Sequence, residues 1–211
     1  MREIVPGLYL LPCRAALLER SRTLLVADAH LGFTHVLRRR GALLPPLDLG
    51  LPRELREAVR QTGAKEVIFL GDVVEAPRPS KEEKRHVREV FASLGAPVHV
   101  VLGNHDRGLI ADFPDVSASE GREVDGFFLR HGDKPPPPGD GPFVLGHFHP
   151  ALRFSDAAGV SHLFPAAVAG ERGICLPAAS PFSRGLAITP RDAPPALTAW
   201  TGPLLRAVVA A

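Results

Sequence analysis

Short apolar runs that end abruptly in polar residues recur along the first half of the chain. Each run is typical of a buried strand, and each is followed at once by Asp, His or Asn. The polar residues come at the same relative point every time, where the strand is expected to end. The three clearest runs span residues 23–30, 66–74 and 97–106.

Two segments between these runs have helical periodicity instead. Residues 47–63 carry apolar side chains at helical spacing, and Gly63 is expected to stop the helix. Residues 80–95 begin with Ser80 and Glu83, the spacing of a capping box. Because strands and helices alternate, the first half predicts an α/β fold with a largely parallel sheet.

The second half has a different pattern, with short apolar runs separated by loops and little helical periodicity. We expect strands in five segments: 125–133, 141–150, 173–180, 185–190 and 196–200. The proline tract 134–142 is expected to be a stiff exposed loop, because proline lacks the N–H that an inner strand needs. No linker or internal repeat divides the chain, so we expect residues 1–211 to form a single domain in which the β-rich half packs on the α/β half.

Composition narrows the class of protein without selecting an activity. The 211 residues are 45% hydrophobic and 23% charged, which is typical of a globular protein. A net charge of +2 neither demands nor excludes a nucleic-acid partner. Cys13 and Cys175 show neither metal-type spacing nor a disulfide framework. With no signal-peptide pattern and no long apolar run, we expect a cytoplasmic protein that does not enter a membrane.

The polar residues at the strand ends are candidates for a metal site. Ligands of open α/β sheets gather outside the carboxyl ends of the strands. Imidazole, carboxylate and amide groups without thiolate suit Mn²⁺, Fe²⁺, Zn²⁺ or Co²⁺, and seven ligands are more than one ion takes. A glycine directly precedes three of these polar residues, and we expect Gly71, Gly103 and Gly146 to bend the backbone there. The candidate ligands are Asp28, His30, Asp72, Asn104, His131, His147 and His149.

The order of these blocks resembles the calcineurin-like metallophosphoesterase superfamily. The blocks are D-x-H (28–30), G-D (71–72), G-N-H-D (103–106), His131 and G-H-x-H (146–149). The resemblance implies a four-layer αββα sandwich with two divalent ions, which we expect to be Mn²⁺, with Fe²⁺, Zn²⁺, Co²⁺ or Ni²⁺ as alternatives. No long insertion separates the blocks, so no cap domain is expected over the site.

The same resemblance divides the ligands between the two ions. Asp28, His30 and His149 would hold one ion. Asn104, His131 and His147 would hold the other, and Asp72 would bridge the pair. The implied enzyme is a metal-dependent phosphoric ester hydrolase, in which a hydroxide that bridges the ions attacks the phosphate ester.

The metals would not supply a proton for the leaving oxygen. His105 follows the ligand Asn104, and we expect it to act as the general acid without binding an ion. Asp106 is expected to orient the His105 ring, with a plain turn-stabilising role as the alternative. Arg107 and Arg38 are candidates for binding substrate phosphate, although both could be ordinary surface residues, Arg38 on a helix that begins after Gly32. Four phenylalanines are read as core rather than as a base-stacking platform: Phe127, Phe128, Phe143 and Phe148.

Residues 23–46 carry a further likeness. This segment looks like the start of the bacterial DNA-ligase-associated metallophosphoesterases, although Phe33 stands where that group commonly has Lys. The likeness implies a phosphodiesterase acting in DNA repair, with nucleic acid as substrate and a ligase or helicase as partner. The alternatives are a phosphomonoesterase acting on small metabolites or nucleotides, and a non-catalytic protein-binding scaffold of the same fold.

Overall fold

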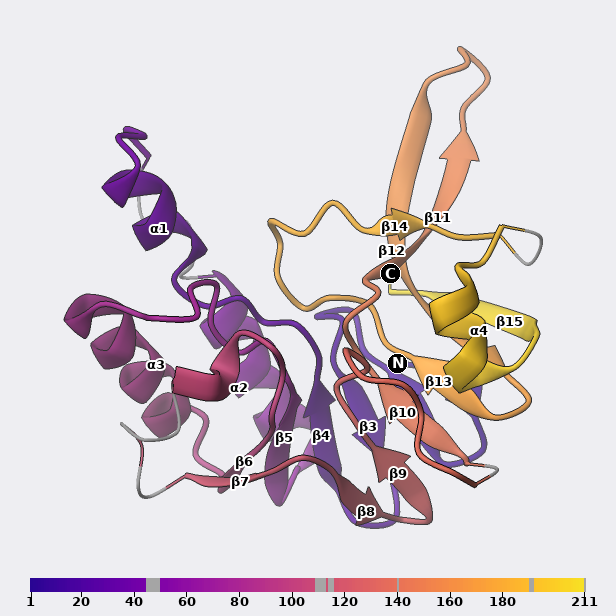
Figure 1. The fold of residues 1–211 in the computed structure, drawn as a ribbon, viewed down its shortest axis with the longest axis horizontal. Helices are drawn as coiled ribbons and strands as arrows, with labels where there is room; N and C mark the ends of the chain where they lie inside the picture. The colour runs from indigo at the N-terminus through magenta and orange to yellow at the C-terminus, as the bar shows by residue number, and fades with distance from the viewer. Residues whose placement is uncertain (45–49, 109–112, 114–115, 140, 190–191, 211) are drawn as a thin grey trace.

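The structure is a computed structural model that describes the chain except residues 45–49, 109–112, 114–115, 140, 190–191 and 211 (Figure 1). The first of its two sheets runs from the N-terminus through the predicted α/β half. Its strands, in spatial and chain order, are β1 (Arg2–Val5), β2 (Leu8–Leu10), β3 (Ala16–Leu18), β4 (Thr23–Val26), β5 (Glu66–Leu70), β6 (Val98–Val101) and β7 (Ser117–Ser119). Neighbours from β1 to β4 are antiparallel, and those from β4 to β7 are parallel.

The second sheet is built from the β-rich half of the chain. Its strands are β8 (Arg122–Val124), β9 (Phe127–Leu129), β10 (Phe143–Leu145), β11 (Pro150–Ser155), β12 (Ser161–Gly170), β13 (Gly173–Cys175), β14 (Leu186–Ala187) and β15 (Leu204–Val209). Their spatial order is β14-β11-β12-β13-β10-β9-β8, and β15 pairs with β12. The antiparallel β11–β12 hairpin projects from the body of the protein (Figure 1).

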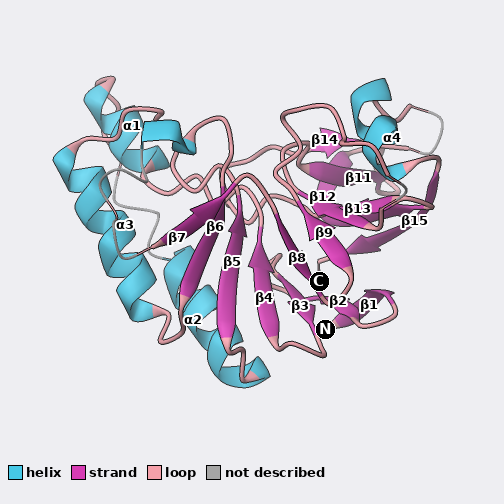
Figure 2. Ribbon diagram, turned by 60° about the horizontal axis from the view of Figure 1, so that its bottom comes forward, coloured by secondary structure: helices cyan, strands magenta, loops and turns pink. Residues whose placement is uncertain are grey.

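Helices cover the outer faces of both sheets (Figure 2). The α-helices of the described chain are α1 (Phe33–Arg39), α2 (Gly50–Thr62), α3 (Lys81–Ser93) and α4 (Pro195–Thr201). Helices α2 and α3 lie beside the first sheet, and α4 lies beside the second. No helix in the described part of the chain is long and apolar enough to cross a bilayer.

Alternating side chains of the inner strands build the layers. In β4, Leu24 packs among residues of α2 and α3, whereas the next residue, Leu25, packs between the sheets. In β5, Phe69 packs with the helices and Ile68 packs between the sheets, because successive side chains of a strand point to opposite faces. On the far side, Trp200 of α4 packs on the outer face of the second sheet. The order is therefore αββα, and the predicted four-layer sandwich is confirmed. The single-domain organisation of residues 1–211 stays a prediction.

The predicted strands and helices of the first half are present with shorter bounds. Ser80 caps α3: its side chain accepts from the backbone N–H of Glu83 at 3.2 Å, and the Glu83 side chain accepts from the N–H of Ser80 in return. Gly63 and Gly95 follow α2 and α3 with positive φ angles of 61° and 70°, as residues that stop a helix do. The first residues of the predicted helix 47–63 lie outside the described residues.

The prediction of a strand at residues 196–200 is wrong, because this segment lies inside α4. Pro195 occupies the first turn of this helix, where its missing N–H costs nothing. Leu197, Trp200 and Thr201 then fall on one buried face at helical spacing. The strand that completes the sheet is β15, further along the chain, and β1 to β3 add antiparallel strands that the apolar pattern did not indicate.

Candidate metal centre

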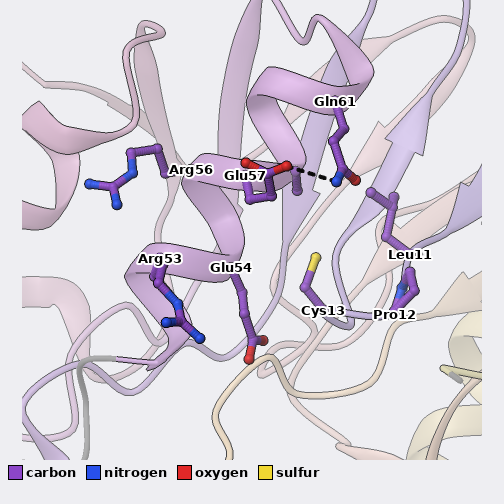
Figure 3. A pocket seen from close by; sticks show the side chains of 9 residues that line it. Leu11, Pro12, Cys13, Arg53, Glu54, Arg56, Glu57 and Gln61 are labelled. Carbon is purple, nitrogen blue, oxygen red and sulfur yellow. Dashed lines mark hydrogen bonds between the residues drawn. The ribbon is translucent and has the colours of Figure 1, made fainter.

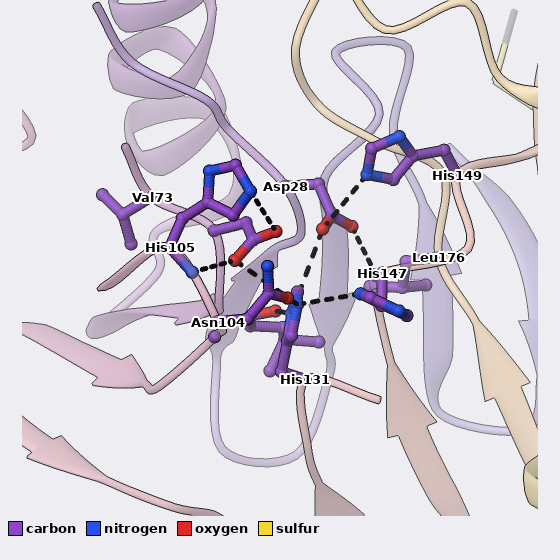
Figure 4. Close-up of polar contacts among 12 residues, drawn as sticks. Asp28, Val73, Asn104, His105, His131, His147, His149 and Leu176 are labelled. Atoms are coloured by element: carbon purple, nitrogen blue, oxygen red, sulfur yellow. Dashed lines mark hydrogen bonds and ion pairs between the residues drawn. The ribbon is translucent and has the colours of Figure 1, made fainter. Parts of the chain in front are cut away.

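The carboxyl ends of β4, β5 and β6 meet at one edge of the first sheet, and the loops after β9 and β10 reach the same place. The candidate ligands from these five segments come together there (Figure 4). Asp28, Asp72 and His131 are buried, with at most 4% of their surface exposed. The remaining ligands lie toward solvent, so two carboxylates and one imidazole form the buried floor of the site, and the Asn104 amide and three imidazoles form its rim.

The backbone at the site is held in an unusual conformation. Eight non-glycine residues of the described chain have positive φ, and five of them are candidate ligands: Asp28, His30, Asp72, His147 and His149. A left-handed conformation costs a non-glycine residue about 1–2 kcal/mol. Such strain persists where the surrounding structure requires a side chain to point in one direction, and it clusters at functional sites.

The glycines before the ligands serve two different purposes. Gly71 has φ +79° and bends the backbone as predicted. At Gly103 and Gly146 the expectation of a bend is corrected, because neither has a positive φ. A Cβ at Gly103 would lie 2.4 Å from Asp72 Oδ1, and one at Gly146 would lie 2.5 Å from Asp28 Oδ2. These two glycines leave room for the carboxylates.

Donor atoms form one group around His131. Its Nε2 lies 3.4 Å from Asp72 Oδ1, 3.2 Å from Asn104 Oδ1 and 3.2 Å from His147 Nδ1. Donor atoms of Asp72, His131 and His147 lie within 4.8 Å of one another. Carboxylate, amide and two imidazoles thus converge on one point.

A second group lies beside the first. Donor atoms of Asp28, His30 and His149 also lie within 4.8 Å of one another, and His149 Nε2 is 3.3 Å from Asp28 Oδ1. The two groups contain the residues that the family resemblance assigns to separate ions. Asp28 Oδ2 accepts from the backbone N–H of His147 at 2.8 Å, which ties the groups together.

Hydrogen bonds on the outer nitrogen orient two of the imidazoles. His131 Nδ1 lies 2.9 Å from the backbone oxygen of Leu70, which requires a proton on Nδ1 and leaves Nε2 free to bind an ion. His149 Nδ1 lies 2.7 Å from Ser183 Oγ, and its Nε2 faces Asp28. Partners of this kind fix the orientation of metal-binding histidines.

Unsatisfied polar atoms show that the residues fit a metal ion. Asp28 Oδ1 and both ring nitrogens of His30 are buried and make no hydrogen bond within the described residues. His30 Nδ1 is 3.0 Å from Glu75 Oε2, but not in the alignment of a hydrogen bond. Buried polar atoms without partners are costly, and coordination of a cation would satisfy them. The donor set of oxygen and imidazole nitrogen suits a divalent first-row metal.

Electrostatics in the site favour a protonated His131 when no cation is present. Burial lowers the pKa of His131, but the Asp72 and Asp28 carboxylates outweigh burial and raise it to about 9. Burial raises the pKa of Asp72, whereas His131 lowers it more, so that the net pKa is well below the usual range. A divalent ion would replace the proton, since a ligating imidazole must be neutral.

His105 and Asp106 do not contact each other in the expected way. The Asp106 carboxylate is fully buried and accepts from the N–H of Val73 at 2.9 Å and of Gly103 at 3.0 Å. The His105 ring is held instead by the backbone oxygen of Glu75, 2.7 Å from Nδ1. The prediction that Asp106 orients His105 is therefore corrected: Asp106 joins the loops after β5 and β6, and its burial raises its pKa to about 6.

Of the two predicted substrate arginines, the structure describes the side chain of Arg38 alone, and Arg38 does not line a cavity with the ligands. Arg38 is exposed on the last turn of α1 and lines a cavity of about 330 Å³ with His35, Arg39, Ser80 and Glu82. None of the candidate ligands lines that cavity. Arg107 follows Asp106 in a short 3-10 helix, but its side chain lies outside the described part of the chain. Both roles stay predictions.

Sequence reasoning missed two residues that hold the site. Glu75 contacts His30 through its carboxylate and His105 through its backbone. Its signal was its place three residues after Asp72, directly beyond an apolar run. Ser183 lies in a loop without periodicity, and nothing in the sequence connected it with His149.

A separate cavity of about 600 Å³ lies between the β2–β3 turn and α2 (Figure 3). Its lining includes Cys13, Glu57 and Gln61 and none of the candidate ligands. Glu57 accepts from Gln61 Nε2 at 2.8 Å and from Arg60 Nε at 2.9 Å, so its charge is compensated locally. Burial raises the pKa of the Cys13 thiol, which keeps it neutral. The chemistry-bearing residues are at the sheet edge and not in this cavity.

Comparisons with known proteins agree with the geometry. The sequence model of the calcineurin-like phosphoesterase family matches residues 21–182. The crystal structure of the nuclease MPE from Pseudomonas putida is similar, with a TM-score of 0.66, 25% identity, and coverage of 88% of this chain and 87% of that one. A protein of unknown function from Aquifex aeolicus has a TM-score of 0.37 and 15% identity over 60% of this chain and 77% of its own. No curated protein matches the sequence.

Proposed function

This chain belongs to the calcineurin-like phosphoesterase family, and we propose that within this family it is a phosphodiesterase that cleaves nucleic-acid strands with two divalent ions, of which Mn²⁺ is the physiological one. Metal-dependent hydrolysis of phosphoric esters is the activity of the family. The diester specificity, the nucleic-acid substrate and the metal are the proposed steps beyond it.

The observation that carries the proposal is the pair of ligand groups at the edge of the first sheet, in a chain whose fold is similar to that of a nuclease. The likeness to the Pseudomonas putida nuclease extends over 88% of this chain and 87% of that one, so the two bodies are of similar size. The family model matches the whole segment from Asp28 to His149. The two groups of donors lie side by side and are joined through Asp28 and the His147 backbone. Two divalent ions bound there would polarise the phosphate and activate a water molecule for in-line displacement.

The protein's own residues would then perform three tasks. Asp28 and Asp72 would offset part of the metal charge and leave a net positive site, which attracts a phosphodiester anion. His131 and His149, fixed by Leu70 and Ser183, would keep their Nε2 atoms aimed at the ions. His105 is half-buried, and its Nε2 lies 4.0 Å from the Asp72 carboxylate. This Nε2 would hold the proton that passes to the leaving oxygen.

The likeness of residues 23–46 to the DNA-ligase-associated group supports placing this activity in DNA repair. In that role the partners would be a damaged or broken strand and a ligase or helicase acting on the same substrate. The cytoplasmic location belongs to the same proposal.

A substrate panel tests the proposal. The purified protein is stripped with chelator, reloaded with Mn²⁺, and supplied with bis-p-nitrophenyl phosphate, p-nitrophenyl phosphate, a cyclic nucleotide, single-stranded DNA and duplex DNA. We expect hydrolysis of the aryl diester and of DNA strands that chelation abolishes and Mn²⁺ restores. A preference for p-nitrophenyl phosphate would identify a monoesterase instead. Hydrolysis that survives thorough chelation would exclude the two-metal reaction, and no hydrolysis of any ester would favour a binding scaffold.

A further inference from the structure

Two phenylalanine rings from distant parts of the chain stack at the border of the metal centre. Phe33 begins α1, three residues after the candidate ligand His30. Phe182 lies in the loop between β13 and β14. Their ring centroids are 4.8 Å apart, and the ring planes differ by 11°. The two rings therefore stack on each other as a nearly parallel pair, which leaves only their outer faces for a further ring.

This pair of rings shares a cavity with the metal ligands. The cavity has a volume of about 180 Å³ and lies on the side of the site where the second donor group is found. It is lined by His30, Phe33, Glu75, His149, Ser180, Phe182 and Ser183. A phosphate held at His30 and His149 would thus have the rings beside it, within the same hollow.

Packing of the core does not account for the two rings. Both are half-buried, and neither belongs to the three apolar clusters of the described chain. Other partly buried phenylalanines do pack on those clusters, as Phe127 and Phe148 show. Burial of apolar surface is the usual reason for a phenylalanine, and here part of each residue stays accessible beside the metal ligands.

Hydrogen bonds hold the loop that carries Phe182, so the stacking of Phe182 on Phe33 is not needed to fix its position. The N–H of Ala179 donates to the Ala27 oxygen at 2.8 Å, and the N–H of Ser180 donates to the Asp28 oxygen at 3.1 Å. Arg14 Nη1 donates to the Ser180 oxygen at 2.9 Å. These bonds fix the loop to the end of β4, so the loop does not depend on the Phe182 ring for its position, and the accessible part of the ring can contact a ligand.

We propose that Phe33 and Phe182 form a stacking platform for a nucleobase next to the scissile phosphate. The inference rests on the proposed function, since a nucleic-acid strand places a planar heteroaromatic ring one sugar away from each phosphate. Aromatic side chains beside a positive groove bind single strands in this way, with little preference among the bases. Arg184, exposed two residues after Phe182, adds a positive charge to the loop that carries this ring.

The platform makes hydrolysis sensitive to the presence of bases. The test compares a single-stranded oligothymidylate with an oligomer of equal length in which every nucleotide is an abasic tetrahydrofuran analogue. For the Mn²⁺-loaded wild type we expect a kcat/KM about 5- to 150-fold higher on the oligomer with bases, mainly through KM. Phe33→Leu and Phe182→Leu are expected to reduce that ratio toward one, whereas Phe33→Tyr and Phe182→Tyr keep it.

Phe154→Leu is the matched control, because Phe154 is 52% exposed on the projecting hairpin. It should leave both the ratio and the activity unchanged. A ratio that persists in both leucine variants, while each still hydrolyses bis-p-nitrophenyl phosphate, overturns the platform and leaves the phosphodiesterase proposal intact. A wild type that hydrolyses no diester overturns the proposed function itself.

A binding measurement without metal gives an independent readout. A short single strand that contains 2-aminopurine is titrated with metal-free protein, and the fluorescence of the base is followed. Stacking on the rings should quench it with the wild type and with Phe154→Leu, and less so with both leucine variants. Equal quenching by all four proteins would show that the base does not meet Phe33 or Phe182.

Discussion

The His105 ring is oriented by the backbone of Glu75, whose carbonyl oxygen lies 2.7 Å from His105 Nδ1. This contact crosses from the loop after β6 to the loop after β5. It leaves Nε2 pointing toward Asp72, at 4.0 Å from its carboxylate. Because a main-chain carbonyl holds the ring, the orientation of His105 does not depend on the ionisation of a neighbouring side chain.

Removal of the His105 ring should slow turnover without loss of metal. His105→Ala lacks the proposed proton donor, so we expect kcat to fall about 10²- to 10⁴-fold while metal content stays near two ions per chain. Asp72→Ala should lose metal, since Asp72 faces His131 and the rest of its group. Steady-state kinetics and elemental analysis of the dialysed proteins measure both effects. A His105→Ala protein with one ion would show that His105 is a ligand.

Removal of the Asp106 carboxylate should destabilise the protein. Asp106→Ala leaves buried N–H groups of Val73, Val74 and Gly103 without their acceptor. Each unsatisfied donor costs about 1–3 kcal/mol, so we expect the free energy of unfolding to fall by about 3 kcal/mol or more. Urea denaturation of the metal-free protein measures the change.

The control for Asp106 is Asp156→Ala. Asp156 also accepts from backbone N–H groups, those of Ala158 and Val160, both at 2.9 Å, but it lies exposed on the hairpin where water replaces it. We expect this variant to lose about 1 kcal/mol or less. Equal losses in the two variants would contradict a special role for the buried carboxylate.

Ser183→Ala should weaken metal binding through His149. Ser183 Oγ contacts Nδ1 of that ring, and loss of an outer partner of a metal-binding histidine typically costs about 10- to 100-fold in affinity. Competition with a fluorescent chelator measures the Mn²⁺ affinity of the weaker site. Ser155→Ala, which removes only an exposed Ser155–Ser161 contact, should bind as the wild type does. An unchanged affinity in Ser183→Ala would show that His149 does not need this support.

The stability of the protein should depend on His99 as the pH falls. His99 lies in β6 between Ser117 Oγ and Ser119 Oγ, and burial, followed by the Arg122 charge, lowers its pKa below 6.5. The neutral ring is therefore favoured in the folded state. Its contribution to stability is present above pH 6.5 and is lost as the pH falls through the lower folded-state pKa.

A comparison of the wild type with His99→Gln isolates that contribution. The free energies of unfolding of the two metal-free proteins are measured in urea at pH 7.5 and at pH 5.5. Other titrating groups are common to both proteins, so the difference reports His99. We expect the advantage of the wild type to shrink on acidification. An advantage that grows would mean that the charged imidazole is the favoured form in β6.

Local patterns were sufficient where the physical cause was itself local. The capping box of α3 needs only Ser80 and Glu83 three residues apart, and it formed as predicted. The segment 196–200 was misread because five residues are too few to tell a helix from a strand. Its environment, with Leu197 and Trp200 packed on the second sheet, decided the helix.

The sequence by itself determined which residues could meet, because parallel strands bring their carboxyl ends to one edge and each strand ended in a candidate ligand. Only the tertiary structure decided which partner each of these side chains contacts. It assigned Asp106 to three backbone N–H groups and gave the orientation of His105 to Glu75. It also brought Phe182 onto Phe33, 149 positions earlier in the chain. Such pairings depend on loops whose path is set by long-range contacts, and no short-range periodicity records them.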